Sequence, residues 1–149
     1  MRKILILLLV SLFHFNTQAQ EQKRARDYGI KIGLIPTGKL NSITDVEGLK
    51  IGHTTLIISD SIRTGVTAIL PYEGNIFQQK IPAAIFVANG FGKLAGSTQV
   101  NELGNIETPI ILTNTLNVAT AMDAVIEYTL NQTGNETVKS VNAIIGETN

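Results

Sequence analysis

The chain has 149 residues, a length that suits one domain. Hydrophobic residues make up 44% of it and charged residues 16%, which excludes a disordered tail and indicates a globular core. The formal net charge is zero, so no positive excess favours nucleic acid as a partner. Cysteine is absent, which excludes disulfides and thiolate metal sites, and the sequence predicts no metal or other cofactor.

The N-terminus has the features of a secretory signal peptide. Arg2 and Lys3 supply a positive start, residues 4–13 are apolar, and Ala19 ends a segment with small residues. The apolar run is too short for a membrane-spanning helix, which needs about 20 residues. A buried N-terminal strand or helix is the alternative interpretation. We expect residues 1–19 to be removed and the mature protein to be exported, either periplasmic or secreted.

The rest of the chain predicts an α/β or α+β domain. A polar mature N-terminus at residues 20–30 precedes the domain portion at residues 31–149. The composition of five short runs predicts strands over residues 49–58, 65–70, 81–88, 106–112 and 141–145. Apolar residues spaced by three and four predict the main helix over residues 118–129. A shorter helix is expected before it, over residues 97–103.

The predicted elements do not make a complete layered domain. Residues 81–88 are almost continuously apolar, which predicts a strand buried on both faces. A sheet with two apolar faces needs a covering layer on each side, and one strong helix cannot supply both. The strand, helix and strand between residues 106 and 145 are expected to form a right-handed crossover unit. We therefore interpret the chain as a fragment rather than a small complete domain.

The glycine-rich segment at residues 89–96 lies between a predicted strand and a predicted helix, the setting of a phosphate-binding loop. The P-loop pattern fails because Leu94 follows Lys93 where serine or threonine is required. A tight turn and the wall of a substrate pocket remain as interpretations. Residues 113–115 and 146–149 also follow strand ends, where ligands of α/β sheets tend to bind, although residues 113–115 could equally cap a helix.

Isolated polar residues give weaker signals. His53 is the only histidine after the expected signal peptide, and a structural role is favoured because no acid or serine motif accompanies it. Glu102, Glu107 and Asp123 occur singly and are expected on the surfaces of helices or loops. Asn135 begins a glycosylation sequon, a pattern that polar loops often match by chance.

Several segments taken together, in their order and spacing, resemble the DmpA-type family of L-aminopeptidase/D-Ala-esterase-amidases and β-peptidyl aminopeptidases. These segments are RARD at 24–27, NSITDVEG at 41–48, IGHTT at 51–55, RTGVTAILP at 63–71, NGFGKLAG at 89–96, ELG at 102–104, ETPI at 107–110 and LTNTL at 112–116. The resemblance extends over residues 24–149. It implies part of a four-layer helix–sheet–sheet–helix sandwich, the N-terminal-nucleophile-like fold shared with ornithine acetyltransferase.

The resemblance implies an exported, self-processing serine aminopeptidase or amidase that releases N-terminal residues from small peptides or amides. Such a precursor cuts itself before a serine, whose freed α-amine then acts as the general base. In the family this serine lies beyond the equivalent of Asn149, so no catalytic residue is expected here and the chain alone should be inactive. Expected partners are a substrate with a free amino terminus, the remainder of the precursor as second subunit, and further copies in a homo-oligomer.

The resemblance also implies the substrate-binding residues. Glu147 matches the family's acidic position in the GETN segment and is expected to hold the substrate's ammonium group. Asn149, Asn114, Asn89 and Gly90 match family motifs as patterns and complete the expected set. The alternatives are a small periplasmic ligand-binding or degenerate non-catalytic protein, and an acyl-transfer enzyme of arginine biosynthesis, against which the export signal argues.

Overall fold

The computed structural model describes residues 23–148, which fall into two units divided after Pro36. The predicted signal peptide at residues 1–19 lies outside the described residues. The first unit contains a 3-10 helix, η1 (Ala25–Tyr28), and the second unit, which begins at Thr37, contains all the other elements. No helix within the described part of the chain is long and apolar enough to cross a membrane.

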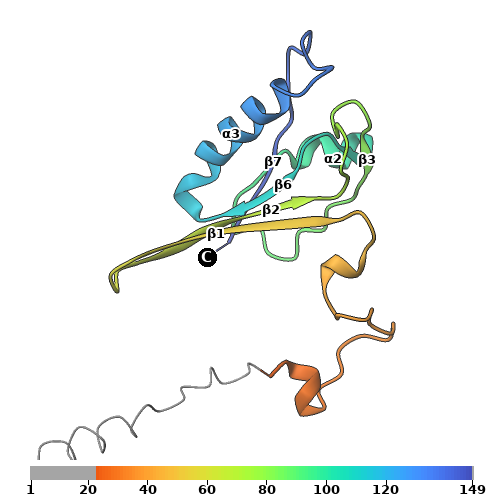
Figure 1. Ribbon diagram of the computed structural model, residues 1–149, viewed down its shortest axis with the longest axis vertical. Helices are drawn as coiled ribbons and strands as arrows, with labels where there is room; N and C mark the ends of the chain where they lie inside the picture. The colour runs from red at the N-terminus through yellow and green to blue at the C-terminus, as the bar shows by residue number, and fades with distance from the viewer. Residues whose placement is uncertain (1–22, 149) are drawn as a thin grey trace, which may run out of the picture. The chain divides into compact units, whose positions relative to one another are not determined.

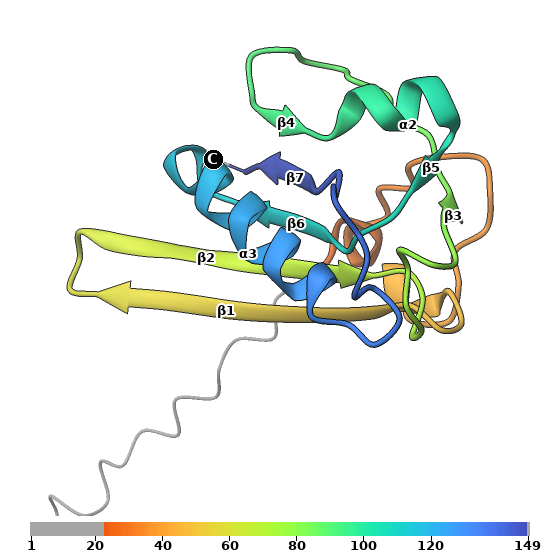
Figure 2. The same cartoon turned by 90° about the horizontal axis from the view of Figure 1, so that it is seen from above.

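The second unit is built on a five-stranded sheet in the order β1-β2-β6-β7-β4 (Figure 1, Figure 2). Its neighbouring strands are antiparallel except for β6 and β7, which are parallel. A second, two-stranded sheet pairs β3 with β5. The strands are β1 (Lys50–Ile58), β2 (Ile62–Leu70), β3 (Ile81–Pro82), β4 (Leu94–Ala95), β5 (Asn105–Ile106), β6 (Ile110–Thr113) and β7 (Ile144–Glu147).

Two α-helices accompany the main sheet. The longer, α3 (Val118–Leu130), connects the parallel strands β6 and β7, so the predicted strand–helix–strand unit is present. The shorter, α2 (Ser97–Leu103), follows β4 within the range predicted from the sequence. Two 3-10 helices, η2 (Ile43–Asp45) and η3 (Thr115–Asn117), precede β1 and α3 respectively. The predicted mixed α/β class is confirmed.

Apolar side chains pack on both faces of the sheet. Ile144 and Ile145 are consecutive in β7, so their side chains point to opposite faces. Ile145 packs with Ile111 of β6 and Val125 of α3 in one cluster. Ile144 packs with Val100 of α2 in the other cluster. The sheet is therefore covered by α3 on one face and by α2 on part of the other.

Three of the predicted strands differ from the observed ones. Within residues 81–88 only Ile81–Pro82 forms a strand, because its partner β5 is equally short, and Phe86 is 91% exposed rather than buried. The predicted strand 106–112 is divided between β5 and β6, and Pro109, which has no N–H to donate to a ladder, lies in the gap. The last strand lies further along the chain than the predicted range 141–145.

Glu107 is buried, contrary to the surface position expected for it. Its Oε2 accepts hydrogen bonds from Lys80 Nζ at 2.7 Å and from Gln99 Nε2 at 3.1 Å. Its Oε1 accepts one from the Asn142 N–H at 2.8 Å. Burial raises the pKa of Glu107, but the hydrogen bonds from these three residues outweigh it and the pKa lies below its ordinary value. One carboxylate thus joins β3, α2 and the segment that leads into β7.

A second polar cluster connects the loop after α3 to the loop before β3. Asn135 Nδ2 donates to the carbonyl oxygen of Thr129 at 2.7 Å. Its Oδ1 accepts from Asn75 Nδ2 at 2.9 Å and from Gln78 Nε2 at 2.8 Å. Asn135 is 1% exposed and both of its side-chain polar atoms are engaged. The sequon at this position is therefore inaccessible in the folded chain.

We predict that Glu107→Gln destabilises the folded protein by about 1–3 kcal/mol, because hydrogen bonds to a charged group are replaced by weaker ones. The folded-state pKa is lowered, so the contribution of Glu107 is complete above about pH 4.5 and is lost as pH falls through the folded pKa. The variant should therefore lose less stability than the parent on acidification. Thermal unfolding at neutral and acidic pH measures both effects. An equal effect of Glu102→Gln, at an exposed position, would contradict this role.

Candidate functional site

The Glu147 carboxylate lies at the end of β7, between two segments distant in sequence. Its Oε1 accepts a hydrogen bond from Thr115 Oγ1 at 2.7 Å. Its Oε2 accepts from the Lys93 N–H at 2.9 Å and lies 3.3 Å from Lys93 Nζ. The Glu147 side chain is only 9% exposed. The hydrogen bonds from Thr115 and from the Lys93 backbone hold the pKa of Glu147 below its ordinary value, so the group is anionic at neutral pH.

Strand pairing places this carboxylate. In the parallel ladder of β6 and β7, Thr113 is the partner of Glu147. On the other side of β7, the Glu147 N–H donates to the Lys93 carbonyl oxygen at 2.9 Å, which extends the pairing with β4. A Cβ added at Gly92 would lie 3.9 Å from Glu147 Cδ, so the glycine-rich loop runs against the carboxylate. The end of the loop thus lies beside the Glu147 carboxylate, and its role as the wall of a substrate pocket stays a prediction.

The end of the glycine-rich segment also requires a glycine for close packing. Gly96 lies between β4 and α2 with a φ of +79°, a conformation that L side chains rarely adopt. A Cβ at this position would collide with the carbonyl oxygen of Ala143, just before β7. Gly96 therefore allows β4, and with it Lys93, to lie directly beside β7.

The other predicted site residues do not contact Glu147 through hydrogen bonds in the described structure. Asn89 and Gly90 are exposed, and Asn89 Oδ1 accepts from the Phe91 N–H at 3.0 Å, which makes a local turn. Asn149 lies outside the described residues. The tight-turn interpretation therefore holds for the start of the loop, whereas its end borders the carboxylate.

Asn114 caps the helical segment that follows β6. Its Oδ1 accepts from Asn117 N at 3.2 Å and from Asn117 Nδ2 at 2.9 Å. Its Nδ2 donates to Thr64 Oγ1 of β2 at 2.9 Å. Asn114 thus fixes the start of η3, and the next residue, Thr115, reaches Glu147. Sequence reasoning did not identify Thr115 or Lys93 as ligands of Glu147, because neither contact follows from a local pattern.

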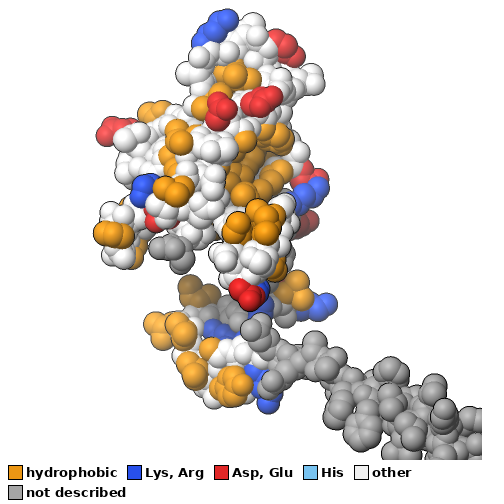
Figure 3. Space-filling model, turned by 90° about the vertical axis from the view of Figure 1, so that its left-hand side faces the viewer, with side chains coloured by type: hydrophobic (Ala, Val, Ile, Leu, Met, Phe, Trp, Pro, Cys, Tyr) orange, Lys and Arg blue, Asp and Glu red, His pale blue; other side chains and the backbone are white. Residues whose placement is uncertain are grey.

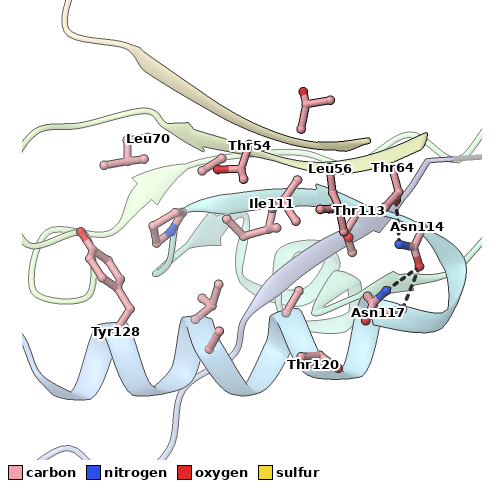
Figure 4. Close-up of a pocket in the computed structure, with 18 residues that line it drawn as sticks. Thr54, Leu56, Thr64, Leu70, Ile111, Thr113, Asn114, Asn117, Thr120 and Tyr128 are labelled. Carbon is pink, nitrogen blue, oxygen red and sulfur yellow. Dashed lines mark hydrogen bonds between the residues drawn. The ribbon is translucent and has the colours of Figure 1, made fainter. Parts of the chain in front are cut away.

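An apolar groove of about 660 Å³ lies between the β1–β2 hairpin, β6 and α3. Thr64, Thr113 and Asn114 lie together at one end of this groove, and Leu70 and Tyr128 lie toward the other (Figure 4). Thr113 is 1% exposed, and its Oγ1 has no hydrogen-bond partner. The groove is open, and most of its length is lined by hydrophobic side chains.

His53 lies on β1, away from the carboxylate contacts. Its Nδ1 is 2.9 Å from Thr67 Oγ1 on the neighbouring strand β2, which agrees with the structural role favoured from the sequence. No group of three or more His, Cys, Asp or Glu side chains that could hold a metal ion is present among residues 23–148.

Comparison with known proteins identifies relatives of the chain. Peptidase family S58 matches residues 41–149. The beta-peptidyl aminopeptidase BapA of Sphingosinicella xenopeptidilytica is 37% identical over 125 residues, which cover 78% of this chain and 31% of that protein. The crystal structure of the PH0078 protein from Pyrococcus horikoshii OT3 has a TM-score of 0.78 and 48% identity, and covers 85% of this chain and 39% of that one.

A third relative is described by its fold. The L-aminopeptidase D-Ala-esterase/amidase from Ochrobactrum anthropi has a TM-score of 0.71 and 28% identity, over 85% of this chain and 38% of that one. It is described as a prototype for the serine aminopeptidases and a new variant among the Ntn hydrolase fold. The chain spans about a third of the length of these relatives. Because the family matches most of its residues, the chain belongs to peptidase family S58.

Proposed function

We propose that this chain is the N-terminal part of an exported, self-processing serine aminopeptidase or amidase that releases N-terminal residues from small peptides or amides. The relatives named as aminopeptidases support this reaction class. The observation that carries the proposal is the enclosed, anionic carboxylate of Glu147 at the end of the parallel strand pair.

The chemistry of an aminopeptidase requires such a group. Its substrate carries a free ammonium group, which loses hydration on entering a site and needs a negative partner there. Glu147 is held anionic by Thr115 and the Lys93 N–H, and both contacts fix the direction of its oxygens. A carboxylate that is oriented before the substrate arrives costs less to order on binding. The position at the carboxyl ends of β6 and β7 is also where α/β sheets commonly bind ligands.

The catalytic nucleophile and the rest of the fold belong, in this proposal, to a following segment of the precursor. The apolar groove gives that segment a surface on which to pack. Exposed apolar residues of the hairpin line this groove, including Leu56 at 48% and Val66 at 40% exposure. Figure 3 shows hydrophobic side chains gathered in a band on the face that it views. Covering such a surface favours association with the remainder of the precursor, since removal of apolar area from water is favourable.

We predict that Glu147→Gln in the full-length precursor leaves self-cleavage intact, because that reaction acts on an internal peptide bond with no ammonium group. Hydrolysis of aminoacyl p-nitroanilides should fall by at least about 30-fold in kcat/KM, since the substrate's charge loses its partner. Processing and kinetics are measured on the same preparation. Glu127→Gln, at an exposed position of α3, is the matched control. A normally processed Glu147→Gln enzyme with parental kinetics would exclude the ammonium-binding role.

We predict that the purified polypeptide of residues 20–149 has no aminopeptidase activity and binds a hydrophobic dye. The nucleophile is expected elsewhere, and the groove would remain uncovered. Turnover of aminoacyl p-nitroanilides and dye fluorescence are measured with and without the remainder of the precursor. A sharp cooperative melt of the isolated polypeptide together with turnover is the result that argues against this proposal.

We also predict export with removal of the signal peptide. N-terminal sequencing of the exported protein from its native host should begin at Gln20, as expected from the charged start, the short apolar run and the small residues near Ala19. Recovery of exported protein that retains Met1 would contradict this expectation.

A further inference from the structure

The ammonium group of Lys93 contacts the Glu147 carboxylate, which is the group that we propose binds the substrate's ammonium group. Lys93 Nζ lies 3.3 Å from Glu147 Oε2, the longest of the three hydrogen bonds that reach this carboxylate. The Lys93 side chain is 56% exposed, whereas that of Glu147 is 9% exposed. The lysine therefore approaches the carboxylate from the solvent side.

The three donors differ in how easily they can leave. The Lys93 N–H is fixed, because its own carbonyl oxygen is bonded to the Glu147 N–H beside β4. Thr115 is fixed in η3, which Asn114 caps. Lys93 Nζ stands at the end of a flexible side chain that regains full hydration when it moves away. Of these donors, only the lysine ammonium is free to exchange with another cation.

The acceptor capacity of the carboxylate leads to the same conclusion. Each carboxylate oxygen offers about two lone pairs. Oε2 already accepts from both nitrogen atoms of Lys93, and Oε1 accepts from Thr115 alone. An incoming ammonium group that bonds both oxygens must take the place of Lys93 Nζ on Oε2. It would also be repelled by the lysine if the lysine remained.

We propose that Lys93 is an internal competitor for the substrate's ammonium group. It neutralises Glu147 in the empty site and must be displaced when a cationic amine binds, so it sets the affinity for such amines. This inference rests on the proposed function of Glu147. The lysine end of this ion pair is exposed to solvent, and a solvent-screened ion pair contributes up to about a factor of five to an equilibrium, which sets the scale of the expected effect.

Lys93→Met in the full-length enzyme tests the proposal. We expect KM for a cationic aminoacyl p-nitroanilide to fall about three- to fivefold with kcat unchanged, and inhibition by n-butylammonium to strengthen by the same factor. Added salt should raise KM more steeply in the variant, because the substrate then approaches an unneutralised carboxylate. Lys93→Arg keeps the positive charge and should not lower KM. Lys139→Met removes a charge at another exposed position and controls for net charge.

The double variant Lys93→Met, Glu147→Gln separates this inference from the proposed function. If Glu147 binds the substrate's ammonium group and Lys93 competes with it, the fall in KM caused by Lys93→Met disappears when Glu147 is replaced by neutral Gln. A purely structural lysine would not give this coupling. If Glu147→Gln alone leaves the kinetics unchanged, the ammonium site itself is wrong. If Glu147→Gln reduces kcat/KM while Lys93→Met leaves KM unchanged or raises it, the site stands and the competitor role of Lys93 is overturned.

Discussion

The parallel pairing of β6 with β7 is the constraint on which the site depends. Parallel strands need a crossover connection, and here α3 supplies it on one face of the sheet. The carboxyl ends of both strands then lie at the same edge. The chain that leaves β6 toward α3 therefore passes the end of β7, and Thr115 meets Glu147 there across a separation of 32 residues. The site is thus a consequence of topology rather than of a local motif.

Two glutamates stabilise the two ends of this strand pair, and their differences agree with a structural role for Glu107 and the proposed binding role for Glu147. Glu107 precedes β6 and bonds the Asn142 N–H before β7, whereas Glu147 ends β7 and bonds the segment after β6. Glu107 holds its lysine at 2.7 Å, and that lysine is 37% exposed. Glu147 holds Lys93 at 3.3 Å, and Lys93 is 56% exposed. The tighter, more enclosed pair fixes the fold, and the looser pair has a cation that can be exchanged.

The sequence predicted those helices and strands whose characteristic residue pattern lies within the element itself. The spacing of Val118 and Val125 identified α3, and the β-branched run identified β1. Apolar character misled at residues 83–88, since a strand also needs a neighbouring strand to pair with. In the described structure the Ala83 N–H donates to the Gly104 carbonyl oxygen, but no strand continues the β3–β5 pairing beyond Pro82. The family resemblance predicted Glu147 as a substrate-binding residue, but it did not predict the contact with Lys93, 54 residues away, because such contacts depend on the tertiary arrangement of β4 and β7.

The proposed chemistry places two amines with similar ordinary pKa values, about 8 each, in one site. The substrate's amine must be protonated to bind Glu147, whereas the amine of the nucleophilic serine must be neutral to accept a proton. An anionic Glu147 favours the charged form of the amine that it contacts, and so raises the pKa of the substrate's amine. The serine amine must therefore lie away from this carboxylate. In the proposed chemistry, a Glu147 carboxylate held anionic by Thr115 and Lys93 would allow the two amines to take opposite protonation states at the same pH.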